Sequence, residues 1–282
     1  MPWRPGQKIY AQQSLTPRRT MGYNLDKTVS DADFQANGEK YGLVPGLVWE
    51  IGTGWAGAHS YANAYVHGRS AFIWACNRSG GALSRGALTK FYSMTGTVVS
   101  GTVDTMTDGA ATFIANEQIG NLFILNNNND SAGAAPEGEF GVITKNTATT
   151  LTIRTAQANQ QFSEALAVND TYSIRSTAQV IASAAGDQES EIAGITVVSS
   201  WADNYWGWLC IQADCIAALV KENTAITKDK GLIADTGRLT VGSTSGQELI
   251  VAYTLDTFAA DIITDLIPVK LRSPYSMQAT SE

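Results

Sequence analysis

The amino-acid sequence predicts an all-β protein, and three observations carry that prediction. Short runs rich in Val, Ile, Thr and aromatic residues recur along the chain, separated by turn-forming Gly, Asn, Asp and Ser. Charged residues make up only 16% of the chain, where soluble domains average about 25%, and small polar residues take their place. The stretches with helical character, 213–223, 257–266 and 116–120, are all brief, and in 213–223 we expect a strand in preference to a helix.

Residues 1–43 predict an extended N-terminal arm, because proline and glycine interrupt them repeatedly. A freely disordered tail is poor in aromatic residues, whereas this arm holds Trp3, Tyr10, Tyr23, Phe34 and Tyr41. Its first part is also basic, with Arg4, Lys8, Arg18, Arg19 and Lys27 against a single carboxylate, Asp26. We therefore expect the arm to lie against a surface, either that of its own body or that of a neighbouring subunit.

Residues 44–94 read as strands and turns. LVWEI (47–51) and SYANAYVHGRSAFIWACN (60–77) are β-rich, and turn signals follow at 79–81 and 85–86. Residues 95–178 form a module of their own, a small β-sandwich or barrel with short strands at regular spacing. Within it GVIT (141–144) and the alternating TTLTIR (149–154) predict a hairpin, and the Asn-rich stretch 126–139 predicts a solvent loop.

Residues 179–282 contain the remaining strands. A linker rich in Gly, Ala, Ser and acidic residues (182–191) precedes a strand at 191–200 and a long aromatic-apolar run at 204–220. Further strands follow in GRLTVG (237–242), QELIVAYTLD (247–256) and DLIPVKLRS (265–273).

No motif for catalysis or for a cofactor is found. The sequence lacks a nucleophile elbow, a phosphate-binding loop and a paired Cys-x-x-Cys, and the Asn-rich run 126–130 lacks the carboxylate spacing of an EF-hand. His59 and His67 have no further ligands nearby, and Glu137 and Glu139 sit in a loop-like stretch. The three cysteines, Cys76, Cys210 and Cys215, lie in apolar runs typical of buried thiols. We expect a non-enzymatic protein with no metal and no cofactor, folded in a reducing compartment.

Aromatic side chains are the most distinctive feature of the last third. Trp201, Tyr205, Trp206 and Trp208 crowd into eight residues. Three interpretations stay open: a strand whose aromatics fill the core, a protein interface, or a carbohydrate platform.

Charge and hydropathy restrict the partners. A formal net charge of -7 disfavours nucleic acid, whose phosphates would be repelled. The N-terminus lacks the apolar core of a secretory signal, and no stretch reaches the roughly 20 apolar residues that cross a bilayer. We therefore expect no membrane partner.

In the last third, the Trp206-Gly207-Trp208 strand is followed by a polar step, NTAITKDKGLIAD, then by QELIVAYTLD and IPVKL. Earlier in the chain stands AFIWACNRSGGALSRGALTKF, with Arg85-Gly86-Ala87-Leu88. The order of the first set resembles that of head decoration and auxiliary capsid proteins of tailed bacteriophages, and the second is similar to the usual opening of the same domain. The chain departs from the pattern at Lys230-Gly231-Leu232 and at Ala252.

The resemblance implies a compact β-tulip-like or barrel-like domain built from 44–94 and 179–282, with 95–178 inserted in it and the arm preceding it. It implies a virion structural protein, made in the cytoplasm of a bacterial host and placed on the capsid surface. The expected partners are the major capsid protein and further copies of the chain in a homotrimer. The predicted interface residues are Trp3, Arg4, Lys8, Tyr10, Arg18, Arg19, Tyr205, Trp206 and Trp208. The alternative function is a carbohydrate- or receptor-binding module of a tail or adsorption apparatus.

Overall fold

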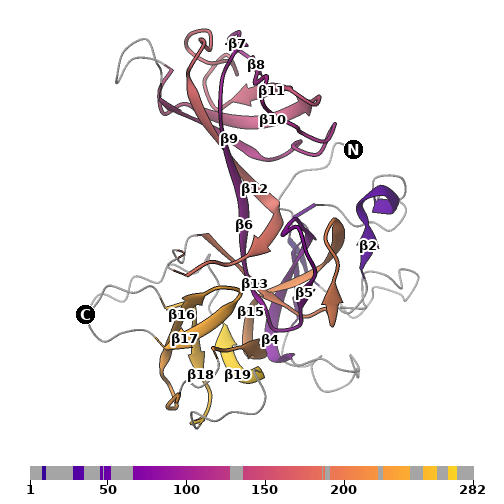
Figure 1. Cartoon of the computed structure of the whole chain (residues 1–282), viewed down its shortest axis with the longest axis vertical. Coiled ribbons are helices and arrows are strands. Elements are labelled where there is room, and N and C mark those ends of the chain that lie inside the picture. Colours follow the sequence, from indigo (N-terminus) through magenta and orange to yellow (C-terminus); the bar gives the residue numbers. More distant parts are fainter. Residues whose placement is uncertain are drawn as a thin grey trace. The chain divides into compact units, whose positions relative to one another are not determined.

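A computed structural model gives the fold of the chain. It describes residues 8–10, 28–34, 45–46, 48–51, 66–127, 136–185, 187, 191–221, 225–241, 250–258 and 266–271, with the backbone alone at 8–10, 49–51 and 67–69. The all-β prediction is confirmed: strands are the main element of the described residues, joined by turns and loops, and the one α-helical turn among them is at 31–34 (Figure 1). No described helix is long and apolar enough to cross a membrane.

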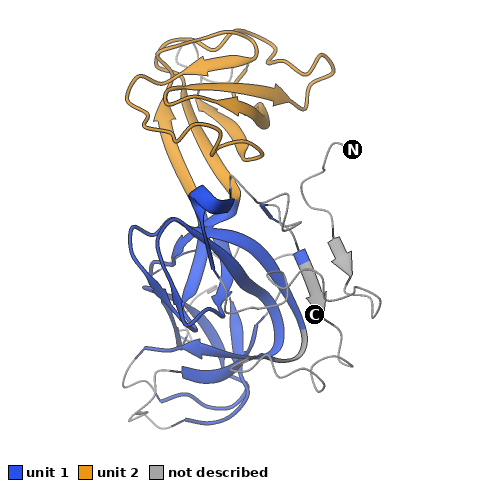
Figure 2. Cartoon of the chain, turned by 90° about the vertical axis from the view of Figure 1, so that its right-hand side faces the viewer, with its two compact units in different colours: residues 1–91, 178–282 blue, residues 92–177 orange. Residues whose placement is uncertain are grey.

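The chain divides into two compact units (Figure 2). Unit 1 comprises residues 1–91 and 178–282, and unit 2 comprises residues 92–177. The bounds expected from the sequence for the inserted module, 95–178, differ from those of unit 2 by three residues at the start and one at the end. The chain leaves unit 1 within strand β6 (Leu88–Thr97) and returns within β12 (Thr171–Ala182).

Unit 1 is built around two long antiparallel strands, β4 (Val66–Asn77) and β15 (Tyr205–Leu219). Their pairing runs from Trp206 opposite Cys76 to Ile216 opposite Val66, with two register shifts. The strand preferred for 213–223 is thereby confirmed as far as Leu219. The other strands of this unit are β1 (Lys8–Tyr10), β2 (Val29–Ser30), β3 (Val48–Ile51), β5 (Leu83–Ser84), β13 (Ile192–Thr196), β14 (Ser200–Trp201), β16 (Gly231–Asp235), β17 (Arg238–Val241), β18 (Ala252–Thr254) and β19 (Leu266–Leu271).

The far half of β15 continues into a small closed ladder. β19 pairs with β15, β18 with β19, β16 with β18 and β17 with β16, all antiparallel. A bridge from Val220 to Leu239 then connects β17 back to the end of β15. The interior of this ladder is filled by buried Ile, Leu, Val and Ala side chains, including Leu232, Leu239 and Val269. Because strand edges meet one another, few backbone groups are left unpaired here.

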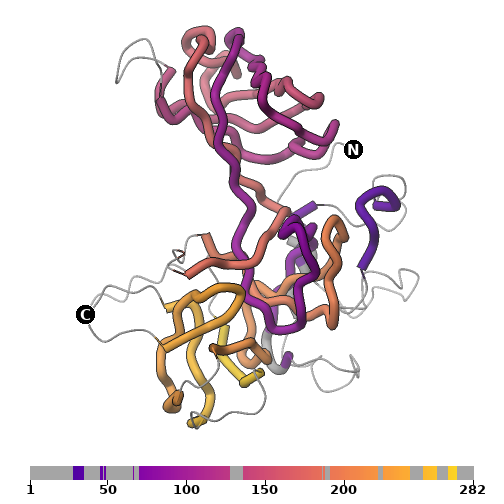
Figure 3. Tube along the Cα trace, in the orientation of Figure 1, coloured from indigo at the N-terminus to yellow at the C-terminus, as the bar shows by residue number. Residues whose placement is uncertain are grey.

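Unit 2 is a small closed β-barrel, whose chain path is traced in Figure 3. Its strands are the upper part of β6, β7 (Ser100–Gly101), β8 (Thr105–Thr107), β9 (Leu122–Asn127), β10 (Phe140–Asn146), β11 (Thr150–Thr155) and the first part of β12. Antiparallel pairing runs β7–β8–β11–β10–β9–β12. The circle closes where Val98, just after β6, exchanges backbone hydrogen bonds with Asn169 and Asp170, just before β12. The hairpin predicted at 141–154 is thus confirmed as β10–β11.

The interior of unit 2 is lined by apolar side chains, and a buried tyrosine in it makes a polar contact. Phe123 stacks on Tyr172 with ring centroids 5.2 Å apart. The Tyr172 hydroxyl donates a 2.7 Å hydrogen bond to Asp108, whose carboxylate also accepts the backbone N–H of Ala110 at 2.8 Å. Gly96 lies against the Tyr172 hydroxyl and the Asp108 carboxylate, where a β-carbon would collide with both, so glycine is required by this close approach.

Two short helices considered for the sequence are not observed where the structure describes them. Residues 116–120 form consecutive turns, with Asn116 in the left-handed region at φ 65°. Most of 257–266 lies outside the described residues, as do His59 and residues 128–135 of the Asn-rich loop.

Candidate interaction surfaces

The described residues present two surface regions that could bind a partner, one on each unit. The first surrounds residues 28–34, which the sequence assigned to the N-terminal arm. β2 pairs antiparallel with the start of β15, placing Val29 opposite Trp206 and Ser30 opposite Tyr205. The helical turn that follows begins with Ser30 as its N-cap, since the Ser30 hydroxyl accepts the N–H of Asp33 at 3.2 Å.

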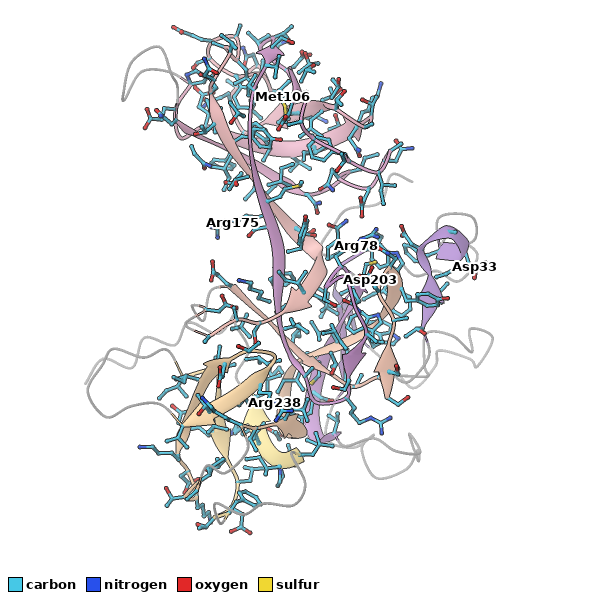
Figure 4. The ribbon with its side chains drawn as sticks, viewed as in Figure 1. Asp33, Arg78, Met106, Arg175, Asp203 and Arg238 are labelled. Carbon is cyan, nitrogen blue, oxygen red and sulfur yellow. The ribbon has the colours of Figure 1, made fainter. Side chains whose placement is uncertain are left out.

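Asp31 fixes this segment to unit 1. One carboxylate oxygen accepts the indole N–H of Trp206 at 2.7 Å, and the other pairs with Arg78 at 3.0 Å. Arg78 also donates to the side-chain oxygen of Asn204, whose backbone carbonyl accepts the N–H of Asp31 at 2.9 Å. The side chains of Arg78 and Asp31 are only 9% and 14% exposed, so water screens this pair weakly. Figure 4 labels Arg78 close to the turn that carries Asp33.

An aromatic column continues from this segment into the core. Phe34 stacks on Trp206 with ring centroids 4.4 Å apart and tilts against Trp74 at 6.1 Å. Trp74 in turn meets Trp208 edge-on at 5.2 Å. Val29 and Phe34 are 4% and 7% exposed, so this part of the arm belongs to the core of its own chain.

The structure corrects part of the predicted interface. Trp206 and Trp208 are 6% and 2% exposed, and Trp201 is fully buried. The strand is covered on both faces, because every residue from Trp206 to Ile211 is buried. These tryptophans therefore fill the core, and they do not form a surface platform. Tyr205, 38% exposed beside the 28–34 segment, keeps the interface prediction.

The other predicted interface residues are in the arm. Lys8 and Tyr10 lie on β1, which pairs parallel with β3, but their side chains are outside the described residues. Trp3, Arg4, Arg18 and Arg19 lie entirely outside them.

The second region is the outer surface of four adjacent strands of unit 2, which we call the β-face: β11, β10, β9 and β12. The cross-strand register aligns Arg154, Val142, Leu122 and Arg175 in one row across them. The next row contains Phe140, Ile124 and Ser173. Phe140 and Val142 are 50% and 44% exposed, so two large apolar side chains face solvent between two exposed arginines.

Positive charge in unit 2 is confined to the β-face. Residues 92–177 contain three basic and eight acidic residues, a formal charge of -5. The basic residues are Arg154, Arg175 and Lys145. Lys145 follows a bulge in β10 and pairs with Thr152, which lies on the same side of β11 as Arg154. All three cations thus lie on the same face as the exposed apolar pair, whereas the unit as a whole is acidic. Figure 4 marks Arg175 on β12.

A further apolar pair of unit 2 lies in the turn segment 114–119. Ile114 and Ile119 are 50% and 45% exposed, with half-buried Glu117 between them in sequence. The buried Asn146 side chain holds this segment, donating to the Ile114 carbonyl at 2.7 Å and accepting the N–H of Gln118 at 2.9 Å. We call this segment the Ile–Glu turn.

The β-face was missed in the sequence, although one signal was present. In FGVITKN apolar residues occupy both phases of the strand, Phe140 and Val142 as well as Ile143. A strand with one solvated face normally alternates apolar with polar residues. Apolar residues in the second phase indicate that the outer face of this strand is also partly apolar.

The described residues offer little for chemistry. They contain no cluster of His, Cys, Asp and Glu that could hold a metal ion. Cys76 and Cys210 are buried, and burial raises the pKa of the Cys210 and Cys215 thiols, which keeps them protonated and poorly nucleophilic. Glu139 accepts hydrogen bonds from the backbone and hydroxyl of Ser163, so it stabilises a loop.

Comparisons with known proteins give no relative from which a site could be transferred. No family model matches the chain, and no curated protein or solved structure matches it.

Proposed function

We propose that this chain is a structural protein of a bacteriophage particle, which binds the outside of the assembled capsid shell and stabilises it without catalysis. A protein that binds only the assembled shell adds its binding free energy to that state alone. The proposal rests on the resemblance in the last third of the sequence and on one structural observation, the anchoring of residues 28–34 in unit 1.

The anchor gives the preceding residues a fixed starting point. Residues 1–27 carry five basic residues and one acidic residue, a formal charge of +4, so the rest of the chain carries -11. The Asp31–Arg78–Trp206 contacts and the burial of Phe34 hold residues 28–34 on unit 1, and within the basic, aromatic stretch before them β1 pairs with β3. A cationic segment is attracted to an acidic protein surface, such as that of a neighbouring shell subunit. Nucleic acid is a poorer partner, because its phosphates would be repelled by the acidic remainder of the chain.

The experiment is co-sedimentation with assembled capsid shells of the phage that encodes this chain. We expect the full chain to sediment with the shells and a variant lacking residues 1–27 to bind at least tenfold more weakly. The deletion must stop at residue 27, because removing Val29, Asp31 and Phe34 would also open the core. The deletion also removes β1, which pairs with β3. Calorimetric unfolding of the truncated chain therefore measures any loss of stability, and binding is compared at a temperature where both chains are folded.

A matched variant separates charge from length. Replacing Arg4, Lys8, Arg18 and Arg19 with Gln keeps the arm but removes four charges, and it should lose most of the binding, more so at low salt. Undiminished binding of the truncated chain would refute the role of the arm. Failure of the full chain to bind shells would refute the capsid assignment.

The alternative function is a carbohydrate- or receptor-binding module, for which the tryptophan cluster was the expected binding platform. The Trp206 and Trp208 rings that would stack on a sugar are buried. A glycan array probed with the full chain tests this alternative, and specific binding abolished by Tyr205→Ala would favour it over the capsid assignment.

A further inference from the structure

We propose that the β-face of unit 2 binds an acidic segment of another protein, in which two carboxylates flank an apolar side chain. This site is separate from the basic arm and from the shell surface proposed for it. Neither proposal depends on the other.

The first argument is the apolar centre of the face. The register of β9 against β10 places Val142 opposite Leu122 and Phe140 opposite Ile124, so four apolar side chains form one block on two adjacent strands. Phe140 and Val142 are exposed, and Leu122 and Ile124 are half-buried. Because three of the four are aliphatic, the block fits the apolar side chains of a protein better than a nucleic-acid base or a sugar ring, which stack on aromatic rings.

The second argument is the charge beside this centre. Arg154 and Arg175 lie at the two ends of the row that contains Val142 and Leu122, and Lys145 lies on the same face. All three cations are exposed, and none of them makes a hydrogen bond or an ion pair with a residue in the described part of the chain. They are therefore available to the carboxylates of a partner, which guanidinium groups can bind through two parallel hydrogen bonds.

The four strands of the β-face also lack acidic residues of their own. Not one Asp or Glu occurs within the bounds of β9, β10, β11 or β12, although unit 2 contains eight acidic residues. Glu139, immediately before β10, is bound to Ser163. Unit 2 thus keeps its carboxylates off the one face that holds its cations, which is the complement of an acidic partner.

The third argument is the spacing along the row. Arg154 and Arg175 are three strand spacings apart, about 14 Å, because neighbouring strands lie 4.7–4.9 Å apart. In an extended segment the side chains on one side repeat every second residue, so residues i and i+4 are about 13 Å apart. An acid-x-apolar-x-acid segment lying across the strands can therefore place a carboxylate at each arginine and its apolar side chain over Val142 and Leu122.

The first test is a methyl NMR titration of the full chain with a nine-residue peptide of glycine and serine, which carries glutamate at its third and seventh positions and leucine at its fifth. We expect shifts at the methyl groups of Val142, Leu122 and Ile124, and binding that weakens as salt is added. A peptide of the same composition with both glutamates adjacent and distant from the leucine should bind at least fivefold more weakly. A peptide with lysine in place of glutamate should not bind. Absence of shifts with the first peptide, or equal binding of either control peptide, would overturn the proposal.

The second test uses variants of the chain. Arg154→Gln with Arg175→Gln should weaken binding of the peptide at least tenfold, and an unchanged methyl spectrum of the free variant shows that it is folded. The matched control is Lys228→Gln with Lys270→Gln, which removes two exposed cations of unit 1 and changes the net charge by the same amount. An equal loss in the two variants would show a general attraction to the chain and no site on the β-face.

The third test distinguishes other occupants of the face. Methyl spectra of the chain alone should not change with its concentration, and oligothymidylate or heparin should shift the β-face methyl groups less than the acidic peptide does. Shifts at Val142 on concentration of the free chain would mean that a second copy covers the face. Stronger binding of either polyanion would mean that the face selects negative charge without an apolar side chain. Each of these two results would contradict the proposal.

Discussion

The two units use their apolar side chains in opposite ways. In unit 1 four tryptophans, Trp74, Trp201, Trp206 and Trp208, are at most 6% exposed, and Tyr205 is the one large apolar side chain exposed among its described residues. Unit 2 has no tryptophan, and it exposes six large apolar side chains on a barrel of 86 residues. Unit 1 thus buries its largest side chains in its own core, whereas unit 2 leaves apolar surface exposed to solvent.

Aromatic density in the sequence therefore does not locate an interface in this protein. The densest aromatic cluster is core, because β15 is covered on both faces. The candidate surface contains a single aromatic residue, Phe140, and is recognised by its cations and by the register that aligns them. Three variants test this contrast between the two units.

The largest effect is expected from Trp208→Ala. The side chain is 2% exposed and packs edge-on against Trp74, so its removal leaves a cavity and should lower the free energy of unfolding of unit 1 by about 3–5 kcal/mol. Calorimetry or denaturant unfolding measures this loss. Tyr205→Ala, three positions earlier and exposed, is the control and should cost about 1 kcal/mol or less. Equal effects of the two variants would contradict the division between core and surface in this strand.

An intermediate effect is expected from Asp31→Ala. The change removes the Asp31–Arg78 ion pair and the acceptor of the Trp206 indole N–H, at a cost of about 1–3 kcal/mol. Hydrogen exchange should show faster exchange at residues 28–34, together with lower stability of unit 1. The control is Asp256→Asn, at an exposed position where the side chain accepts the N–H of Thr257. It should change neither the exchange at 28–34 nor the stability of unit 1. Unchanged exchange at 28–34 would mean that Asp31 does not anchor the segment.

The smallest effect is expected from Tyr172→Phe in unit 2. The loss of the hydrogen bond to Asp108 should cost about 1 kcal/mol at pH 7. Burial, and then Asp108, raise the pKa of the Tyr172 hydroxyl. The folded state therefore retains a proton that the unfolded state releases above pH about 10, and stability falls as the pH rises beyond that value.

Tyr172→Phe also tests the predicted fall of stability with rising pH. Phenylalanine has no proton to release, so the advantage of the natural chain over Tyr172→Phe should shrink between pH 9 and 11 in urea unfolding of unit 2. A difference that stays constant, or grows, across this range would show that the hydroxyl titrates normally in the folded state.

Local patterns were sufficient for a good part of the fold. The β10–β11 hairpin follows from the alternation in TTLTIR and from the KNTA segment (145–148) that precedes it. Asn169 adopts φ 72° in a turn, a conformation that Asn tolerates better than most residues. The bounds of unit 2 follow from strand spacing and turn residues that can be read along the chain. These features depend on residues close in sequence, so the sequence contains their causes.

The two candidate surfaces depend on contacts between distant residues. Asp31 meets Trp206 across 175 positions, and no local pattern predicts that contact. Hairpin alternation places Phe140 and Val142 on one side of β10, but the sequence does not show that Arg175 joins them, because that requires the register of β12 against β9. A shift of one residue in that register would turn Arg175 to the interior.

By itself the sequence determined that this is an all-β chain with a separate middle module, because turn residues and alternation act over a few positions. The tertiary structure alone decided which aromatics are buried and that residues 28–34 belong to the core, since both depend on what covers each face of β15. It also placed the three cations of unit 2 on the face that exposes Phe140 and Val142. The physical reason is the same in each case: burial and cross-strand alignment are properties of the paired sheet and of no single strand.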